Sequence, residues 1–329
     1  MRHVLRLALA RGAVVTLANW PVAVIQATAD ALLKLLVLTP AVGGLFLVAL
    51  VVDTAPGELV SLDWRPMATA IAAALLAHPL VLVAFLAAVA VSLVGGTLFV
   101  LLAKGGTLGV LLAGERASLE HEGEPAIEWL PGCARFTVDR FAASATRLFP
   151  RYAILAALLT AVYAACGGVY LASTLGLPDG PAGLPWVALV TAAFVLVITA
   201  VNVCYLLVQI VVAAEDCPLV PALRQTARFL RHTARDVGVV AGATLALMVA
   251  ASAASLLAAA AVGLIGFVPV FGLALLPLQL GAWVLRSWLF QCLGLTAAGA
   301  YATLYRQFAE RRPLALASPT LGAAILPGH

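Results

Sequence analysis

The sequence predicts an all-α fold: a polytopic integral membrane helical bundle of about six transmembrane helices in three hairpins, with cytoplasmic amphipathic helices. The first observation is composition, because 64% of the 329 residues are hydrophobic and only 10% are charged, whereas a soluble domain carries roughly 25% charged residues. The second is a series of apolar runs long enough to cross a bilayer, without the alternating pattern of a β-barrel. The third is the uneven distribution of lysine and arginine along the chain.

Six apolar segments have the length and composition of membrane spans. They lie near 31–52, 79–103, 152–175, 186–214, 237–262 and 281–305. The second is set apart by His78-Pro79, because the residue before a proline avoids the helical conformation; we interpret His78 as an interfacial residue, not a ligand. All six belong to a single helical membrane domain, 1–312, and a disordered tail is expected at 313–329.

Segment 263–280 is apolar but does not have the character of a full span. It is interrupted by Gly266, Pro269, Gly272 and Pro277, which break helices or bend them. We therefore expect an interfacial or re-entrant segment here. Arg286, which follows it, is expected to reach the outer headgroups from the first turn of the sixth span.

The basic residues predict the orientation of the spans. Most of them fall before the first span, between 104 and 151, between 224 and 235, and after residue 305, whereas Arg65 alone lies in an outer loop. Loops on the cytoplasmic side are enriched in Lys and Arg, so both termini are expected in the cytoplasm. The basic N-terminal stretch is interpreted as a retained amphipathic helix and not as a signal peptide, because no convincing cleavage site follows it.

Each hairpin is preceded by a basic amphipathic segment: 4–18, 132–149 and 219–235. The third is the most regular, because its arginines recur at i, i+4, i+7 and i+11 and therefore share one helical face, with Leu223, Ala227, Leu230 and Ala234 beside them. This pattern is typical of a helix lying on a membrane surface. The candidate lipid- or partner-binding residues are Arg224, Arg228, Arg231, Arg235, Arg135, Arg140 and Arg147.

An acidic pair, Glu215-Asp216, stands between the fourth span and this basic segment, which Pro218 and Pro221 open. A carboxylate at the start of a helix accepts hydrogen bonds from free N–H groups and complements the helix dipole. We therefore predict a structural capping role for Glu215 and Asp216.

No motif of known chemistry is present. The sequence contains no GxSxG, no Walker-type glycine loop, no HExxH and no CxxC, so we predict no catalytic residue and no cofactor. The acidic stretch with Glu120, His121, Glu122 and Glu124 fits no metal-binding spacing, so no metal site is predicted. The cysteines are interpreted as small apolar residues; they are Cys133, Cys166, Cys204, Cys217 and Cys292.

Two strings carry a family resemblance: VVAAEDCPLVPALRQTARFLRHTARDVGVV, which begins at Val211, and YATLYRQF, which begins at Tyr301. Together they resemble a broad prokaryotic superfamily of six-span membrane proteins. It includes the membrane domain of some glycerophosphodiester phosphodiesterases and related uncharacterised membrane proteins. The resemblance implies a bacterial inner membrane and a connection with lipids. It implies no hydrolysis, because the soluble phosphodiesterase barrel is not found in this sequence.

Two classes of function remain. The first is a non-enzymatic membrane protein that binds membrane phospholipids, anionic ones above all, or a protein partner through its basic cytoplasmic helices. The second is a transporter or lipid-handling permease with a cavity between hairpins, which the interrupted segment 263–280 favours because broken helices often line cavities. We expect no nucleic-acid partner, and the sequence indicates no oligomeric state.

Overall fold

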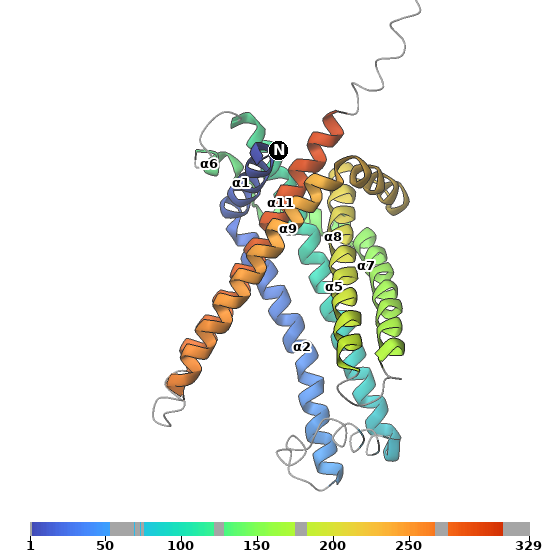
Figure 1. Ribbon diagram of the computed structural model, residues 1–329. Coiled ribbons are helices and arrows are strands. Elements are labelled where there is room, and N and C mark those ends of the chain that lie inside the picture. Colours follow the sequence, from blue (N-terminus) through green and yellow to red (C-terminus); the bar gives the residue numbers. More distant parts are fainter. Residues whose placement is uncertain are drawn as a thin grey trace, which may run out of the picture. The chain divides into compact units, whose positions relative to one another are not determined.

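The computed structural model describes residues 2–52, 69, 73, 76–121, 128–174, 183–266 and 276–311. Within these residues the chain is almost entirely helical and contains no strand, which confirms the all-α class. The elements, drawn in Figure 1, are α1 (Arg2–Ala18), α2 (Trp20–Val52), α5 (Pro79–Ala117), η1 (Ser118–His121), α6 (Leu130–Cys133), α7 (Val138–Thr174), α8 (Leu184–Glu215), α9 (Leu219–Gly266) and α11 (Leu276–Glu310).

Five of the described helices are long and apolar enough to cross a membrane. These segments are Trp20–Phe46, Pro79–Ala117, Val138–Thr174, Leu184–Glu215 and Leu219–Ala258. Their large apolar side chains are widely exposed: Leu80 is 86% exposed, Leu257 is 73% and Leu196 is 71%. A soluble protein does not leave such extensive apolar surface in water, whereas in a bilayer these side chains contact acyl chains. The protein is therefore a multi-pass helical membrane protein.

The sixth predicted span, 281–305, is helical but is not among these five. It lies in α11, where Gln279, Arg286 and Gln291 reduce the mean hydropathy of the first half. The second half is buried by protein, since residues 297–305 all belong to the core. Both ends of segment 263–280 are helical: α9 continues to Gly266, and α11 begins at Leu276. The middle of that segment, the tail at 313–329 and Glu122 and Glu124 lie outside the described residues.

Several helices are longer than the predicted spans. α2 begins at Trp20 and not at 31, and α5 continues to Ala117 instead of ending at 103. The predicted surface helix 132–149 and the span 152–175 also differ from the structure: α7 joins them from Val138 through Pro150 to Thr174, while Ala134 after α6 has extended backbone angles. Neighbouring helices stabilise these extensions by packing, which local sequence patterns do not report.

α9 shows the predicted division most clearly. Its backbone departs from helical geometry at Thr233, where φ is −127° and ψ is 20°, and Figure 1 shows the helix bending sharply in this region. The bend separates the basic segment of α9, defined here as residues 219–232, from a long apolar segment. The predicted boundary at 235–237 is thus close to the observed one, although Arg235 lies just beyond the bend.

The chain forms two compact units, and residues Ile25–Lys104 make up one of them. In this unit Gly44 of α2 lies against Phe85 of α5, since a Cβ at Gly44 would come within 2.8 Å of Phe85 Cδ2. Gly96 of α5 lies against Leu33 of α2 in the same way. Because later residues of one helix meet earlier residues of the other, the two helices run antiparallel.

The other unit comprises Met1–Val24 and Gly105–His329. Its core includes Leu111 in the last turns of α5, Leu148 near the start of α7, Ile210 near the end of α8, Phe229 near the start of α9 and Tyr301 near the end of α11. Consecutive helices run in opposite directions, so these positions share one end of the unit. This is the end at which the basic segments are predicted to face the cytoplasm.

Candidate functional site

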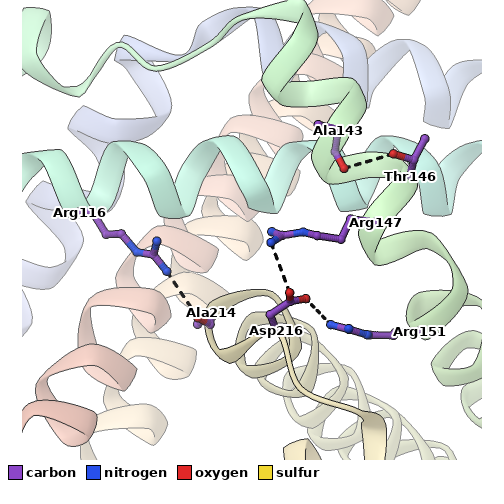
Figure 2. Close-up of polar contacts among 7 residues, drawn as sticks. All are labelled: Arg116, Ala143, Thr146, Arg147, Arg151, Ala214 and Asp216. Carbon is purple, nitrogen blue, oxygen red and sulfur yellow. Dashed lines mark hydrogen bonds and ion pairs between the residues drawn. The ribbon is translucent and has the colours of Figure 1, made fainter.

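Charged side chains gather at the end of the larger unit where its core lies. The first of them is Asp216, at the turn between α8 and α9. Asp216 follows the last residue of α8 with φ 48° and ψ 35°, a left-handed conformation that Asp and Asn tolerate better than most residues. Its carboxylate pairs with two arginines of α7: Arg147 Nη1 is 3.5 Å from Oδ2, and Arg151 Nη1 binds Oδ1 (Figure 2). Asp216 therefore ends α8 and holds α7; its capping of the start of α9 stays a prediction.

A third arginine reaches the same turn from α5. Arg116 Nη2 donates a hydrogen bond of 3.4 Å to the carbonyl oxygen of Ala214, one of the carbonyls that a helix leaves without an intrahelical donor at its C-terminus. Figure 2 shows Arg116, Arg147 and Arg151 all directed toward residues 214–216. We call these three arginines and Asp216 the arginine cluster; its one carboxylate leaves two positive charges uncompensated.

Glu215 faces a different set of partners. Its Oε1 accepts a hydrogen bond from the Tyr305 hydroxyl of α11 and another, 2.9 Å long, from Gln225 Nε2 of α9. Phe229 of α9 lies edge-on to the Tyr305 ring, with centroids 5.4 Å apart. Glu215 thus attaches the basic segment of α9 to α8 and α11, and its predicted capping role stays a prediction.

A second group of charges is buried beside this turn. Arg306 Nη1 of α11 lies 2.9 Å from Glu115 Oε1 of α5. Arg11 of α1 is 1% exposed and its guanidinium lies over the Trp129 ring, 5.5 Å from the centroid. Arg11 also interacts electrostatically with Glu115. These residues, the buried charge cluster, join α1, α5 and α11.

The arginines of the basic segment of α9, together with Arg235 just beyond the bend, have a different environment. Arg224, Arg228, Arg231 and Arg235 are all exposed, and none of them forms an ion pair with any other described residue. The opposite face packs on the protein through Ala222, Gln225, Thr226 and Phe229, each at most 5% exposed.

The apolar row that the sequence predicts beside these arginines is not the packed face. Of its members, Leu223 is 38% exposed, Ala227 and Ala234 are also exposed, and Leu230 is half-buried. At 100° per residue this row lies between the arginines and the packed face. The segment therefore directs an arginine row and an adjoining apolar row away from the protein.

The remaining predicted binding residues do not form one row. Arg135 precedes α7, and its backbone N–H donates to Asn19 Oδ1 over 2.8 Å. Arg140 Nη1 donates to the Arg135 carbonyl over 2.9 Å. Arg147 belongs to the arginine cluster, so the three residues that the sequence grouped have three different roles. Arg286, which the sequence predicts near the start of the span 281–305, is the eleventh residue of α11, with its guanidinium 5.7 Å from the Phe290 ring centroid.

The cysteines outside the spans are not poised for nucleophilic chemistry. Burial raises the pKa of the Cys133 thiol. Burial also raises the pKa of Cys217, and the negative charge of Glu215 raises it further. Reactive cysteines show the opposite shift. Within the described part of the chain, no three His, Cys, Asp or Glu side chains come together as a metal site would require.

Sequence reasoning missed the buried charge cluster and the role of Tyr305. One signal for the cluster was present: residues 105–114 are apolar apart from threonine and glycine, which is compatible with a continuing helix. That continuation places Glu115 in the final turn of α5 and not in a loop. No local signal pointed to Tyr305, because it contacts Glu215 across 90 residues of sequence.

Comparison of the chain with protein-family models, with curated proteins and with solved structures finds no match. The resemblance described above therefore stays a prediction. The fold and the site define a multi-pass α-helical membrane protein whose larger unit carries arginines at one end. Its function has to be inferred from that site.

Proposed function

We propose that this is a non-enzymatic protein of the bacterial inner membrane that binds anionic phospholipid headgroups through the basic segment of α9. One observation carries the proposal: Arg224, Arg228 and Arg231, with Arg235 just beyond the bend, are exposed and have no acidic partner among the described residues. Elsewhere in the unit, Arg147, Arg151 and Arg306 are all paired with carboxylates. The unpaired row is thus available to an anionic partner outside the chain.

The exposed apolar row favours a membrane as that partner. Val220 and Leu223 are exposed beside the arginines, and a surface helix inserts such residues at the acyl boundary while its guanidinium groups stay at phosphate level. Each basic residue near an anionic leaflet contributes about 1 kcal/mol, so four contribute roughly 4 kcal/mol at low salt. Salt screens this attraction, because the Debye length is about 8 Å at physiological ionic strength.

The orientation proposed here follows from the same residues. The basic segment of α9 lies at the end of the unit that holds the arginine cluster and Arg306, and basic residues accumulate on the cytoplasmic side of membrane proteins. We therefore place this end, with both chain termini, in the cytoplasm. Phosphatidylserine-like or phosphatidylglycerol-like headgroups of the inner leaflet are then within reach of the arginine row.

A protein partner is the alternative, and one version of it is intramolecular. The acidic stretch that begins at Glu115 is the chain's own candidate for binding the arginine row. Glu115 itself is 2% exposed and is paired with Arg306, and residues 122–127 of this stretch lie outside the described residues. The transporter alternative depended on the interrupted segment 263–280, whose centre lies outside the described residues, so no observation favours it.

Lipid-dependent thermal stability tests the proposal. We expect phosphatidylglycerol to raise the melting temperature of the detergent-purified protein more than phosphatidylcholine does, and we expect 0.5 M salt to reduce the difference. The triple variant Arg224→Gln, Arg228→Gln, Arg231→Gln should lose most of the difference, because it removes about 3 of the roughly 4 kcal/mol. The matched triple Lys variant keeps the charge and should retain it.

Two results would contradict the proposal. One is equal stabilisation of the native protein by phosphatidylcholine and phosphatidylglycerol. The other is an undiminished preference for phosphatidylglycerol in the triple Gln variant, provided that this variant has the melting temperature of the native protein in detergent alone. The second result would indicate that other basic residues recognise the headgroup.

A further inference from the structure

The arginine cluster is a second place where the larger unit concentrates positive charge, and it differs from the α9 row by containing its own anion. Three guanidinium groups, from Arg116, Arg147 and Arg151, meet at residues 214–216 (Figure 2). They come from two helices, α5 and α7, that both pack at this end of the unit. Among the described residues, Asp216 supplies the one carboxylate here, and it binds Arg147 and Arg151.

The neighbouring acid, Glu215, forms no ion pair with these arginines. Glu215 directs its Oε1 to the Tyr305 hydroxyl and to Gln225 Nε2, and these contacts belong to the attachment of α9. Among the described residues, the hydrogen-bond partner of Arg116 is a carbonyl oxygen in the turn, at 3.4 Å. A carbonyl carries a partial charge, so the Arg116 guanidinium stays electrostatically uncompensated there.

The contacts are accessible to a solute. The side chains of Arg147, Asp216 and Arg151 are 52%, 47% and 30% exposed. Exposed ion pairs contribute little to stability, because water already solvates both groups well. An external anion can therefore replace the Asp216 carboxylate without a large cost to the fold.

We propose that the arginine cluster is a phosphate-binding site in which Asp216 occupies the place of the phosphate when none is bound. A phosphate monoester, such as the headgroup of phosphatidic acid, has three acceptor oxygens and a charge of about −1.5 to −2 near neutral pH, and guanidinium groups bind it with paired, charge-assisted hydrogen bonds. It thus satisfies three arginines, whereas Asp216 satisfies two. The phosphate group belongs either to a lipid headgroup or to a free anion; the lipid source rests on the proposed function, which brings headgroups to this end of the protein.

Asp216→Asn is the informative variant. Asn tolerates the left-handed conformation found at this position, so the turn is kept while the competing negative charge is removed. The variant should bind phosphate more tightly than the native protein, by about three- to tenfold if the two exposed pairs have ordinary strengths. If Asp216 had only a structural role, its replacement would not raise the affinity for phosphate.

The experiment measures the melting temperature of the full-length, detergent-purified protein during two titrations. One uses inorganic phosphate against sodium chloride at matched ionic strength, and the other uses nanodiscs of phosphatidylcholine with increasing phosphatidic acid. We expect Asp216→Asn to shift the midpoint of at least one titration to lower concentration. Adding Arg147→Gln and Arg151→Gln should abolish that gain, whereas adding Arg6→Gln, an exposed arginine of α1, should not.

The two titrations also distinguish the sources. A shift with phosphatidic acid but not with inorganic phosphate assigns the site to lipid, and the reverse assigns it to a free anion. No shift in either titration overturns the proposal, as does a shift that survives Arg147→Gln with Arg151→Gln. If the Asp216→Asn protein does not fold, the double variant Arg147→Gln, Arg151→Gln is tested with Asp216 intact. Its melting temperature should no longer respond to phosphate, and a retained response overturns the proposal.

Repeating the titrations in the background of Arg224→Gln, Arg228→Gln and Arg231→Gln separates this inference from the proposed function. The gain caused by Asp216→Asn in the phosphate titration should persist there, because the α9 arginines are not part of the cluster. If this background loses the preference for phosphatidylglycerol but keeps the gain caused by Asp216→Asn, the result supports both the α9 arginine row and the arginine cluster as separate sites. If Asp216→Asn gives no gain even when the α9 arginines are intact, the phosphate site at the arginine cluster is contradicted and the proposed function is not.

Discussion

Arg306 of α11 bridges two acids of very different burial. Its Nη1 lies 2.9 Å from Glu115 Oε1, and its Nε lies 3.3 Å from Glu310 Oε1. The Glu115 side chain is 3% exposed and that of Glu310 is 60% exposed. One arginine therefore provides an internal comparison between a buried ion pair and a surface ion pair.

Glu115→Gln should strongly destabilise the protein. It removes the buried carboxylate that pairs with Arg306 and interacts with Arg11, and breaking a buried pair in this way costs about 3–5 kcal/mol. Glu310→Gln is the matched control and should cost less than about 0.5 kcal/mol, because the pair is an exposed i,i+4 contact. Thermal unfolding in one detergent measures both, and equal effects of the two substitutions would contradict a structural role for the buried charge cluster.

Gly299→Ala tests the contact between α1 and α11. A Cβ at Gly299 would lie 2.8 Å from Gly12 Cα, which is backbone and has no side chain to move aside. We expect overpacking to cost about 1–3 kcal/mol. Gly294→Ala on the same helix is the control, since a Cβ there meets nothing within 4 Å and alanine favours the helix by about 1 kcal/mol. A Gly299→Ala protein that unfolds no earlier than Gly294→Ala would argue against this helix contact.

Local sequence patterns predicted the features that local physics determines. The apolar runs gave the helical membrane class, and the spacing of Arg224, Arg228 and Arg231 gave one exposed row. Pro218 and Pro221 marked the start of α9, which begins at Leu219. In each case the deciding interaction is that of a residue with solvent, with lipid or with a helical neighbour, and such interactions repeat with the helical period.

The features that sequence reasoning missed depend on packing between distant helices. α5 continues to Ala117 because Gly105 and Gly109 let α7 approach: a Cβ at Gly105 would lie 3.3 Å from Ala145 Cα, and one at Gly109 would overlap the Ser144 side chain. That extension buries Glu115. Asp216 likewise contacts Arg151, 65 residues away. Patterns within one helix carry no information about either partner.

Tyr305→Phe should loosen the basic segment of α9. It removes the hydroxyl that donates to Glu215 while keeping the ring packed against Phe229. A hydrogen bond to a charged group contributes about 1.5–3 kcal/mol, and Gln225 still binds Glu215, so we expect the lower value. Hydrogen exchange should become faster across residues 219–232 of α9. Tyr301→Phe, one turn earlier in α11, is the control because its hydroxyl has no hydrogen bond with the described residues; equal exchange in both variants would argue against the Glu215 attachment.

Cys217 should react slowly with thiol reagents near neutral pH. Burial and the adjacent Glu215 raise its pKa, so at a given pH a smaller fraction is thiolate than for an ordinary cysteine, whose pKa is about 8.5. In a protein whose other cysteines are replaced by alanine, the alkylation rate should therefore rise at higher pH than it does after denaturation in detergent. Coincident pH profiles for the native and denatured protein would contradict the raised pKa.

The two connections that flank α8 should lie on opposite sides of the membrane. α8 has 32 residues, which corresponds to about 48 Å at 1.5 Å per residue, well beyond the roughly 30 Å of a hydrocarbon core. With the basic end in the cytoplasm, Asp179→Cys, outside the described residues, should react with a membrane-impermeant maleimide on intact cells. Cys217 should react only after permeabilisation, at a pH high enough to form its thiolate. The reverse pattern would invert the proposed orientation, and labelling of both sites from outside would show that α8 does not cross the membrane.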